Sequence, residues 1–269
     1  MSDDSSSEIP TGGRWRPVAE VLVSLQFLTR LPIPFVRTID PQPLALAMRC
    51  FGLAGALIGA MNGVVLIGLG YLHLPALMTA GLVIGFGLFL TGALHEDGFA
   101  DSADGLFGGR TRDRRLEIMR DSRIGTYGAS ALGVLILMRA GAFEALLQQP
   151  PWQIILITAA CGAFSRAMVV DLLWATRPAR TDGLSAMAGR PDRVTALGAI
   201  VSAGALTVCA GLNVSANAGV LALGIALVIT GFIRRMATKL IGGQTGDICG
   251  AVQVLSEMGM LAVFVSTLH

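Results

Sequence analysis

The sequence predicts an all-α integral membrane protein: a polytopic helical bundle of about seven transmembrane helices with an N-terminal amphipathic helix. Composition is the first reason, because 53% of the 269 residues are hydrophobic and only 14% are charged. Soluble domains carry about a quarter charged residues. The apolar residues also gather in runs long enough to cross a bilayer, and nearly all Lys and Arg residues fall on one side of these runs.

The chain begins with an acidic, polar segment, Met-Ser-Asp-Asp-Ser-Ser-Ser-Glu, which lacks the positive charge of a signal peptide. We predict that residues 1–16 form a disordered tail and that residues 17–269 form a single membrane-embedded domain. Val18–Leu28 is apolar but too short to span a bilayer, so we expect an amphipathic helix at the membrane surface.

Seven apolar runs follow and are the predicted spans: Cys50–Leu72, Pro75–Leu94, Tyr127–Leu147, Trp152–Trp174, Val194–Leu212, Ala218–Ile233 and Gly250–Leu268. With these spans, 18 of the 20 Lys and Arg residues share one side of the membrane, in the segments 1–49, 95–126, 175–193 and 234–249. Because cytoplasmic loops carry an excess of Lys and Arg, this side is predicted to face the cytoplasm.

Glycines recur at every fourth position in two of the predicted spans. One stripe contains Gly55, Gly59 and Gly63, and the other contains Gly81 and Gly85. Small residues at this spacing let helix backbones approach closely in a membrane. Both stripes therefore predict helix packing.

Residues 95–126 hold 13 of the 38 Asp, Glu, Lys and Arg residues of the chain. If the preceding apolar helix continues through this segment, Asp97, Asp101 and Asp104 share one helix face. Three carboxylates on one face repel each other unless a cation lies between them, and such oxygen ligands suit Mg2+ or Mn2+. We predict a divalent cation here, with Glu96 a weaker ligand candidate and His95 a residue of the membrane interface.

The arginines that follow have two interpretations. Arg110 and Arg112 are explained by topology alone, since cytoplasmic loops carry arginine. The spacing of apolar residues predicts an amphipathic helix after them, and we expect Arg114, Arg120 and Arg123 to bind substrate phosphates through their guanidinium groups. The segment thus combines carboxylates for a metal with cations for phosphates.

Two further arginines lie inside predicted spans. Arg166 is near the middle of its span, where a charge is costly, so it is expected to point into the bundle towards acids of another span or a ligand phosphate. Arg139 lies in the outer half of its span and is expected to extend towards the membrane surface.

The last cytoplasmic segment, 241–250, contains Gln244 and Thr245 between glycines, a composition suited to contacts with a phosphate or sugar. We predict that both bind substrate. Asp247 is a candidate metal ligand or general base and is expected to approach the acidic stripe across the bundle. Asp121 is the rival base, and the sequence does not rank the two.

These motifs, in this order, resemble those of the cobalamin synthase family, also called adenosylcobinamide-GDP ribazoletransferase. The resemblance rests on Phe27-Leu28-Thr29-Arg30-Leu31-Pro32, Asp97-Gly98, Ala100-Asp101, Asp104-Gly105, Asp113-Arg114, Leu116-Glu117-Ile118-Met119-Arg120-Asp121-Ser122-Arg123, Gly125-Thr126 and Gly242-Gly243-Gln244-Thr245-Gly246-Asp247. It extends from Phe27 to the C terminus.

The resemblance implies a multi-pass enzyme of the bacterial inner membrane whose active site faces the cytoplasm. This transferase would join adenosylcobinamide-GDP to alpha-ribazole or alpha-ribazole 5'-phosphate, releasing GMP and forming adenosylcobalamin or its 5'-phosphate. The reaction would require Mg2+, and residues 17–269 would be the catalytic domain. Asp104, Asp121 and Asp247 are then the candidate catalytic residues. The lipid bilayer is an expected partner, nucleic acid is not, and a homo-oligomer is compatible with the sequence.

A carboxylate-coupled membrane transporter is the alternative. A transporter would place its acids near mid-membrane, usually at broken helices. Only Glu144, Asp171 and Glu257 lie within the predicted spans, and none has an evident partner. The clustering of acids and arginines at one membrane face favours the enzyme.

Overall fold

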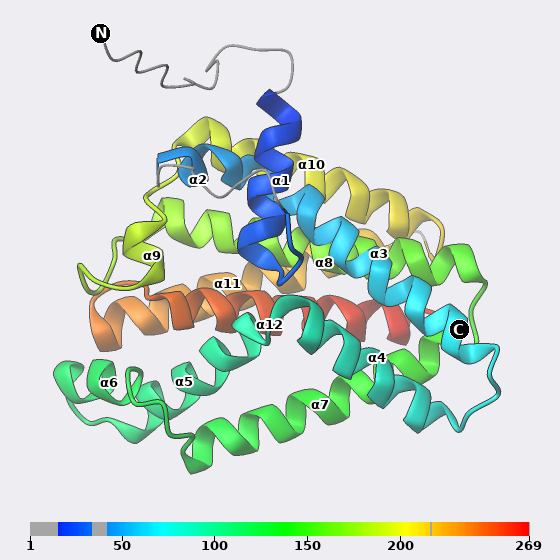
Figure 1. Ribbon diagram of the computed structural model, residues 1–269, viewed down its shortest axis with the longest axis horizontal. Coiled ribbons are helices and arrows are strands. Elements are labelled where there is room, and N and C mark those ends of the chain that lie inside the picture. Colours follow the sequence, from blue (N-terminus) through cyan, green and yellow to red (C-terminus); the bar gives the residue numbers. More distant parts are fainter. Residues whose placement is uncertain (1–15, 34–41, 216, 269) are drawn as a thin grey trace, which may run out of the picture.

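The structure is a computed structural model that describes residues 16–33, 42–215 and 217–268. Residues 1–15 of the predicted tail lie outside the described residues. All regular elements of the described residues are helices, which confirms the all-α prediction (Figure 1). They are α1 (Arg16–Leu28), α2 (Gln42–Ala47), η2 (Met48–Cys50), α3 (Phe51–Gly70), α4 (Ala76–Thr91), α5 (Leu94–Gly108), α6 (Arg112–Ile118), α7 (Thr126–Leu146), α8 (Pro151–Ala175), α9 (Leu184–Met187), α10 (Arg193–Leu212), α11 (Ala218–Ile241) and α12 (Gly246–Ser266).

Six segments of the described chain are long and apolar enough to cross a membrane. One is Leu44–Gly70, which comprises the end of α2, η2 and all of α3. The others are α7, α8, α10, α11 and α12. The pair α4 and α5 passes the same test only when taken together, and it is bent by 93°. The polytopic bundle of about seven spans is thereby confirmed. We treat α5, with its four acidic residues, as outside the six spans.

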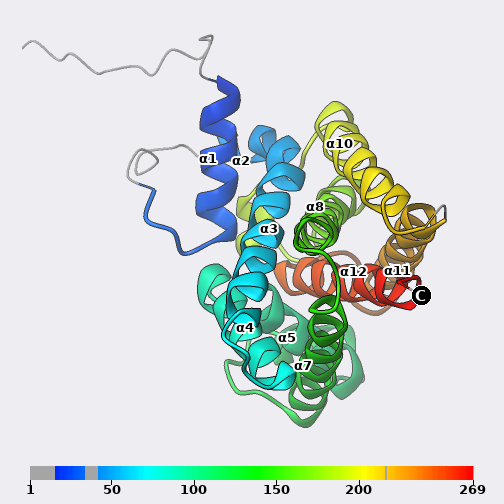
Figure 2. The same cartoon turned by 90° about the vertical axis from the view of Figure 1, so that its right-hand side faces the viewer.

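Helix α8 is the centre of the bundle. In its most apolar 18-residue window 89% of the residues are buried, against 28% in α11, so α8 is enclosed by protein while most residues of α11 are not buried. Figure 2 shows α8 surrounded by α3, α10 and α12. Helix α1 stands across the long helices instead of beside them (Figures 1 and 2), as predicted for a segment too short to span.

The glycine stripe on α3 explains its contact with α8. A Cβ atom on Gly55 would lie 2.1 Å from the carbonyl oxygen of Gly162, and one on Gly59 would lie 2.1 Å from that of Thr158. The predicted packing of this stripe is confirmed. The prediction for Gly81 and Gly85 was wrong, because no described atom lies within 4 Å of a Cβ at either position. Spacing alone does not tell a helix face that meets a neighbour from one that faces outward.

The apolar helix does not continue into the acidic stripe, which corrects the sequence-based expectation. Helix α4 ends at Thr91 and α5 starts anew at Leu94. The two residues between them, Gly92 and Ala93, have left-handed backbone angles (φ of 64° and 53°). The side chain of Arg30 lies against Gly92, where a Cβ atom would come 2.3 Å from its Nε. The N–H of Arg30 also donates to the carbonyl of Leu90 at 2.8 Å. The segment after α1 thus packs against this turn through Arg30.

The boundaries of two predicted spans were also wrong. Helix α11 continues to Ile241 and α12 already begins at Gly246. Hydropathy falls at the charged residues near these ends, but the helical hydrogen bonds do not depend on apolar side chains. The Thr245 side chain caps α12 by accepting the N–H of Ile248. The connection between α11 and α12, predicted to be the last cytoplasmic loop, is therefore only residues 242–245.

Arg139 points into the bundle and not towards the membrane surface, contrary to expectation. Its side chain is 10% exposed and pairs with Glu96, which is 12% exposed. The pair joins α7 to the first turn of α5. Two opposite charges that are removed from water together stabilise each other, and for this reason the position tolerates an arginine in a predicted span.

Loss of one partner of this pair is expected to destabilise the fold. Arg139→Met should lower the free energy of unfolding by about 3–5 kcal/mol, because Glu96 would keep an uncompensated buried charge. Reversible unfolding in mixed micelles, followed by circular dichroism, measures this. The double variant Glu96→Gln/Arg139→Met should recover much of the loss. An equal loss in the double variant would contradict the pairing argument.

Candidate active site

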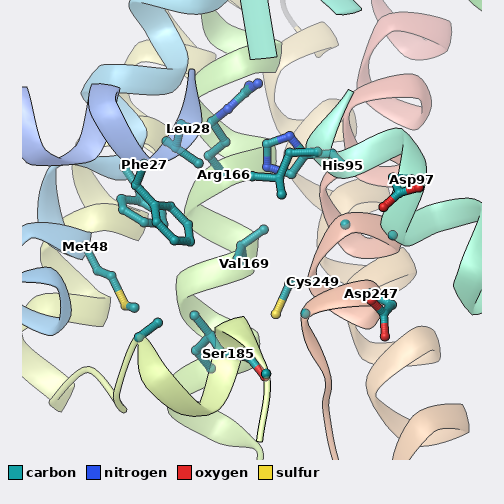
Figure 3. Close-up of a pocket in the computed structure, with 18 of the residues that line it drawn as sticks. Phe27, Leu28, Met48, His95, Asp97, Arg166, Val169, Ser185, Asp247 and Cys249 are labelled. Carbon is teal, nitrogen blue, oxygen red and sulfur yellow. The ribbon is translucent and has the colours of Figure 1, made fainter. Parts of the chain in front are cut away.

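A cavity lined by both charged and apolar side chains lies where α1, α3, α5, α8 and α12 meet (Figure 3). This main cavity has a volume of about 280 Å³. Asp97 and Asp247 lie on one side of it, and Phe27 and Met48 lie on the other. The main cavity therefore has a carboxylate wall and an apolar wall.

The carboxylate wall forms because α5 and α12 touch through glycines. A Cβ atom on Gly98 would lie 3.0 Å from the Cα of Asp247, and one on Gly250 would lie 2.7 Å from the carbonyl oxygen of His95. Larger residues at these two positions would separate the helices. Asp247 thus lies beside the acidic helix, as expected from the sequence.

The charges of this wall act on Asp101. The pKa of Asp101 is raised to about 7, chiefly by burial and to a smaller extent by repulsion from Asp97, Asp247 and Asp104. No three His, Cys, Asp or Glu side chains of the described chain are close enough to hold a metal ion as they stand. The donor chemistry nevertheless fits a hard divalent cation, because carboxylate oxygens with excess negative charge are what Mg2+ prefers.

Asp104 has a structural role in addition to its predicted one. Its carboxylate accepts the backbone N–H of Gly125 at 2.7 Å and that of Gly128 at 3.0 Å. Both donors lie at the start of α7, so Asp104 fixes the N-terminal end of α7 against α5. Its role as a metal ligand or catalytic group stays a prediction.

Gln244 and Thr245 are both buried, at 2% and 0% exposure. The main-chain N–H of Gln244 donates to the carbonyl of Arg177 at 2.9 Å, and its carbonyl accepts the N–H of Ala179 at 2.8 Å. Thr245 also donates through Oγ1 to Asp247 Oδ2 at 3.0 Å. These contacts position the loop and Asp247, and the predicted contacts with substrate remain untested.

Two residues of the main cavity were missed or undervalued by the sequence analysis. Arg180, from the segment between α8 and α9, lines the cavity and lies 3.5 Å from Asp247 through Nη2 and Oδ2. An isolated arginine in a loop gives no signal in the sequence. His95 also lines the cavity and is 5% exposed, so it is a buried residue and not one of the membrane interface.

Arg120, one of the predicted phosphate-binding arginines, lines a second, more open space. This loop groove has a volume of about 470 Å³ and is lined by Arg112, Asp113, Leu116, Glu117, Arg120 and residues 179–182. Arg120 pairs with Asp182 at 2.8 Å, and Arg114 pairs with Glu117 at 2.8 Å. Arg112 connects the end of α11 to the loop after α8 by donating to the carbonyls of Ile241 and Ala179.

Asp121 and Arg123 form an exposed pair on the loop after α6, at 2.7 Å. Hydrogen bonds from Arg123 lower the pKa of Asp121 to about 2. Neither residue is among those that line the main cavity, whereas Asp247 is. The structure therefore gives Asp247 the better position for the general base, and the chemical role of both residues stays a prediction.

Arg166 points into the bundle, as the sequence predicted. Its Nη1 donates to the carbonyl of Gly162 at 3.1 Å and lies 3.8 Å from Glu257 Oε2. Its buried Nε has no hydrogen-bond partner among the described residues, and the side chain lines the main cavity. Glu257, which had no evident partner in the sequence, therefore lies beside the Arg166 guanidinium. Asp171 likewise lies 3.4 Å from Arg234. These partners come from other helices and were invisible in the sequence.

Comparison with known proteins agrees with the motifs. The chain matches the family model described as cobalamin-5-phosphate synthase over residues 20–265. It is 42% identical over 250 residues to the adenosylcobinamide-GDP ribazoletransferase of Azorhizobium caulinodans, covering 91% of this chain and 95% of that protein. Proteins of the same name from Bradyrhizobium diazoefficiens and Xanthobacter autotrophicus are 40% and 42% identical, each over 91% of this chain and 93% and 95% of their own lengths. No solved structure matches this chain.

Proposed function

The chain belongs to the cobalamin-5-phosphate synthase family, and from this premise we propose that it is an adenosylcobinamide-GDP ribazoletransferase. The family match over residues 20–265 supports this proposal most directly, and the cavity walled by Asp97 and Asp247 is consistent with it. The enzyme would transfer the phosphate attached to cobinamide from GMP to a ribose hydroxyl of alpha-ribazole or its 5'-phosphate. The family match gives no support to the transporter alternative.

The reaction would take place at the cytoplasmic face of the bacterial inner membrane. The concentration of Lys and Arg on one side of the spans supports this orientation. The main cavity and the loop groove both border segments predicted to be cytoplasmic, because Arg180 lines both spaces and Asp247 follows the last loop. A bulky substrate could reach them from the aqueous side.

Asp97, Asp101 and Asp104, the ligand set predicted from the sequence, would hold Mg2+. When bound, the metal would supply Lewis-acid stabilisation of the charge on the transferred phosphate and the departing GMP. Asp247 would accept the proton of the attacking ribose hydroxyl. Thr245, which donates to Asp247 Oδ2 at 3.0 Å, would keep that carboxylate oriented.

Other residues would bind and orient the substrates. The apolar wall with Phe27 and Met48 suits the benzimidazole base of alpha-ribazole, which is flat and apolar. The buried, unpartnered Nε of Arg166 can donate to a phosphate oxygen. Arg120 and Arg123, with Arg114 beside them, would bind phosphates at the more open side.

The proposal is tested by following GMP release from adenosylcobinamide-GDP by the full chain in detergent micelles. Release should require alpha-ribazole or its 5'-phosphate and should stop when Mg2+ is chelated, because the carboxylate wall alone repels the phosphates. Addition of Mg2+ should restore it. Release at the same rate without either ribazole would mean hydrolysis and would contradict the transfer reaction.

A further inference from the structure

Arg180 lines both the main cavity and the loop groove. The two spaces differ in character. The main cavity has the carboxylate wall and the apolar wall, while the groove is lined mostly by charged side chains such as Arg120, Asp182 and Glu117. Ligand groups bound in the two spaces would therefore meet at Arg180.

The backbone that carries Arg180 is fixed. The N–H of Ala179 donates to the carbonyl of Gln244 at 2.8 Å, and the carbonyl of Ala179 accepts from Arg112 at 2.6 Å. The loops are so close at Gly243 that a Cβ atom there would lie 2.3 Å from the carbonyl oxygen of Arg177. The side chain of Arg180 therefore extends from a rigid base, and this favours a defined binding geometry.

The guanidinium of Arg180 is poorly satisfied in the free protein. Its distance of 3.5 Å to Asp247 is long for a charge-assisted hydrogen bond, which is typically about 2.7–2.9 Å. Its Nη1 is buried and has no hydrogen-bond partner among the described residues. By contrast, Arg120 donates to both oxygens of Asp182 at 2.8 Å. A mostly buried cation with unused donors is suited to an anionic ligand.

We propose that Arg180 binds the diphosphate of adenosylcobinamide-GDP at the junction of the two spaces, and that Asp247 holds the guanidinium there until the substrate arrives. This inference rests on the proposed function. The planar guanidinium can donate to two phosphate oxygens at once. The guanosine would lie in the loop groove, where Asp182 and Glu117 can accept hydrogen bonds from the guanine N–H groups.

The test compares Arg180→Gln with Arg177→Gln in the full chain in micelles. Arg177 is an exposed arginine of the same segment, so the control loses the same charge. Equilibrium binding is measured with adenosylcobinamide-GDP and with alpha-ribazole, which has no phosphate. Arg180→Gln should raise the Kd for adenosylcobinamide-GDP by roughly 10-fold or more and leave that for alpha-ribazole unchanged. Arg177→Gln should change neither value by more than about 2-fold.

Unchanged binding of adenosylcobinamide-GDP by folded Arg180→Gln would overturn the inference. An equal loss of affinity for both ligands, together with a lower Tm, would assign Arg180 a purely structural role and would also overturn the inference. If the wild-type chain binds neither ligand and releases no GMP, the proposed function fails and this inference fails with it. Binding by the wild type that is lost only in Arg180→Gln, and only for the diphosphate, supports both.

Discussion

Replacing Asp97 with Ala is expected to lower the rate of GMP release by roughly 100-fold or more while leaving the protein folded. Asp97 lines the main cavity beside Asp247, and its carboxylate is not used by the fold in the way that Asp104 is. Removing it takes away a ligand of the proposed cation at the site of charge development. The measurement is the initial rate of GMP release, together with the Tm of the purified variant.

The matched control is Glu144→Ala, because Glu144 is an exposed acid of α7 that lines neither the main cavity nor the loop groove. It should keep nearly wild-type activity. A rate within about 5-fold of wild type for Asp97→Ala would show that Asp97 is not a metal ligand, since loss of a group that stabilises transition-state charge costs at least 10²-fold.

The other two acids of the stripe should separate in their effects. Asp101→Ala is expected to lose activity as Asp97→Ala does, with little change in Tm. Asp104→Ala should lose activity and also stability, because the N–H groups of Gly125 and Gly128 would lose their acceptor at the start of α7.

Gly55→Ala is expected to lower the free energy of unfolding by about 3 kcal/mol, the upper end of the range for overpacking. Its new Cβ would lie 2.1 Å from the carbonyl oxygen of Gly162 and 2.8 Å from Cδ of Arg166. The carbonyl belongs to the backbone of the central helix α8, so it cannot move without shifting that helix. Reversible unfolding in mixed micelles measures the loss.

Gly81→Ala is the control, because no described atom lies within 4 Å of the added Cβ. It should change the free energy of unfolding by less than about 1 kcal/mol, and in the stabilising direction, since alanine favours a helix over glycine. Equal losses in the free energy of unfolding of both variants would mean that the α3–α8 contact does not require glycine at position 55.

Much of the fold could be predicted because its signals are local. The length of an apolar run is enough to predict a span, and the distribution of Lys and Arg around the runs is enough to predict which side faces the cytoplasm. The same holds for the acids of α5, which share a face because they are three and four residues apart in one helix. The shared helix face of these acids therefore needed nothing beyond the sequence, whereas their role as metal ligands stays a prediction.

The partners of the buried charges could not be predicted, because they come from helices far apart in the chain. Arg139 pairs with Glu96 across 43 positions, and Arg180 lies beside Asp247 across 67. The turn at Gly92 was missed because the apolar pattern of α4 gives no sign of a left-handed residue at its end. Neither kind of feature leaves a periodic signal.

The sequence by itself determined the class of fold, the family and the shared helix face of the acidic stripe. Only the tertiary structure decided which acids meet in the main cavity, that Asp104 is occupied in capping α7, and that Arg180 joins the main cavity to the loop groove. The physical reason is that hydropathy and helical spacing act along the chain. Contact between α5 and α12 depends instead on the absence of side chains at Gly98 and Gly250, and its effect appears only when the two helices pack.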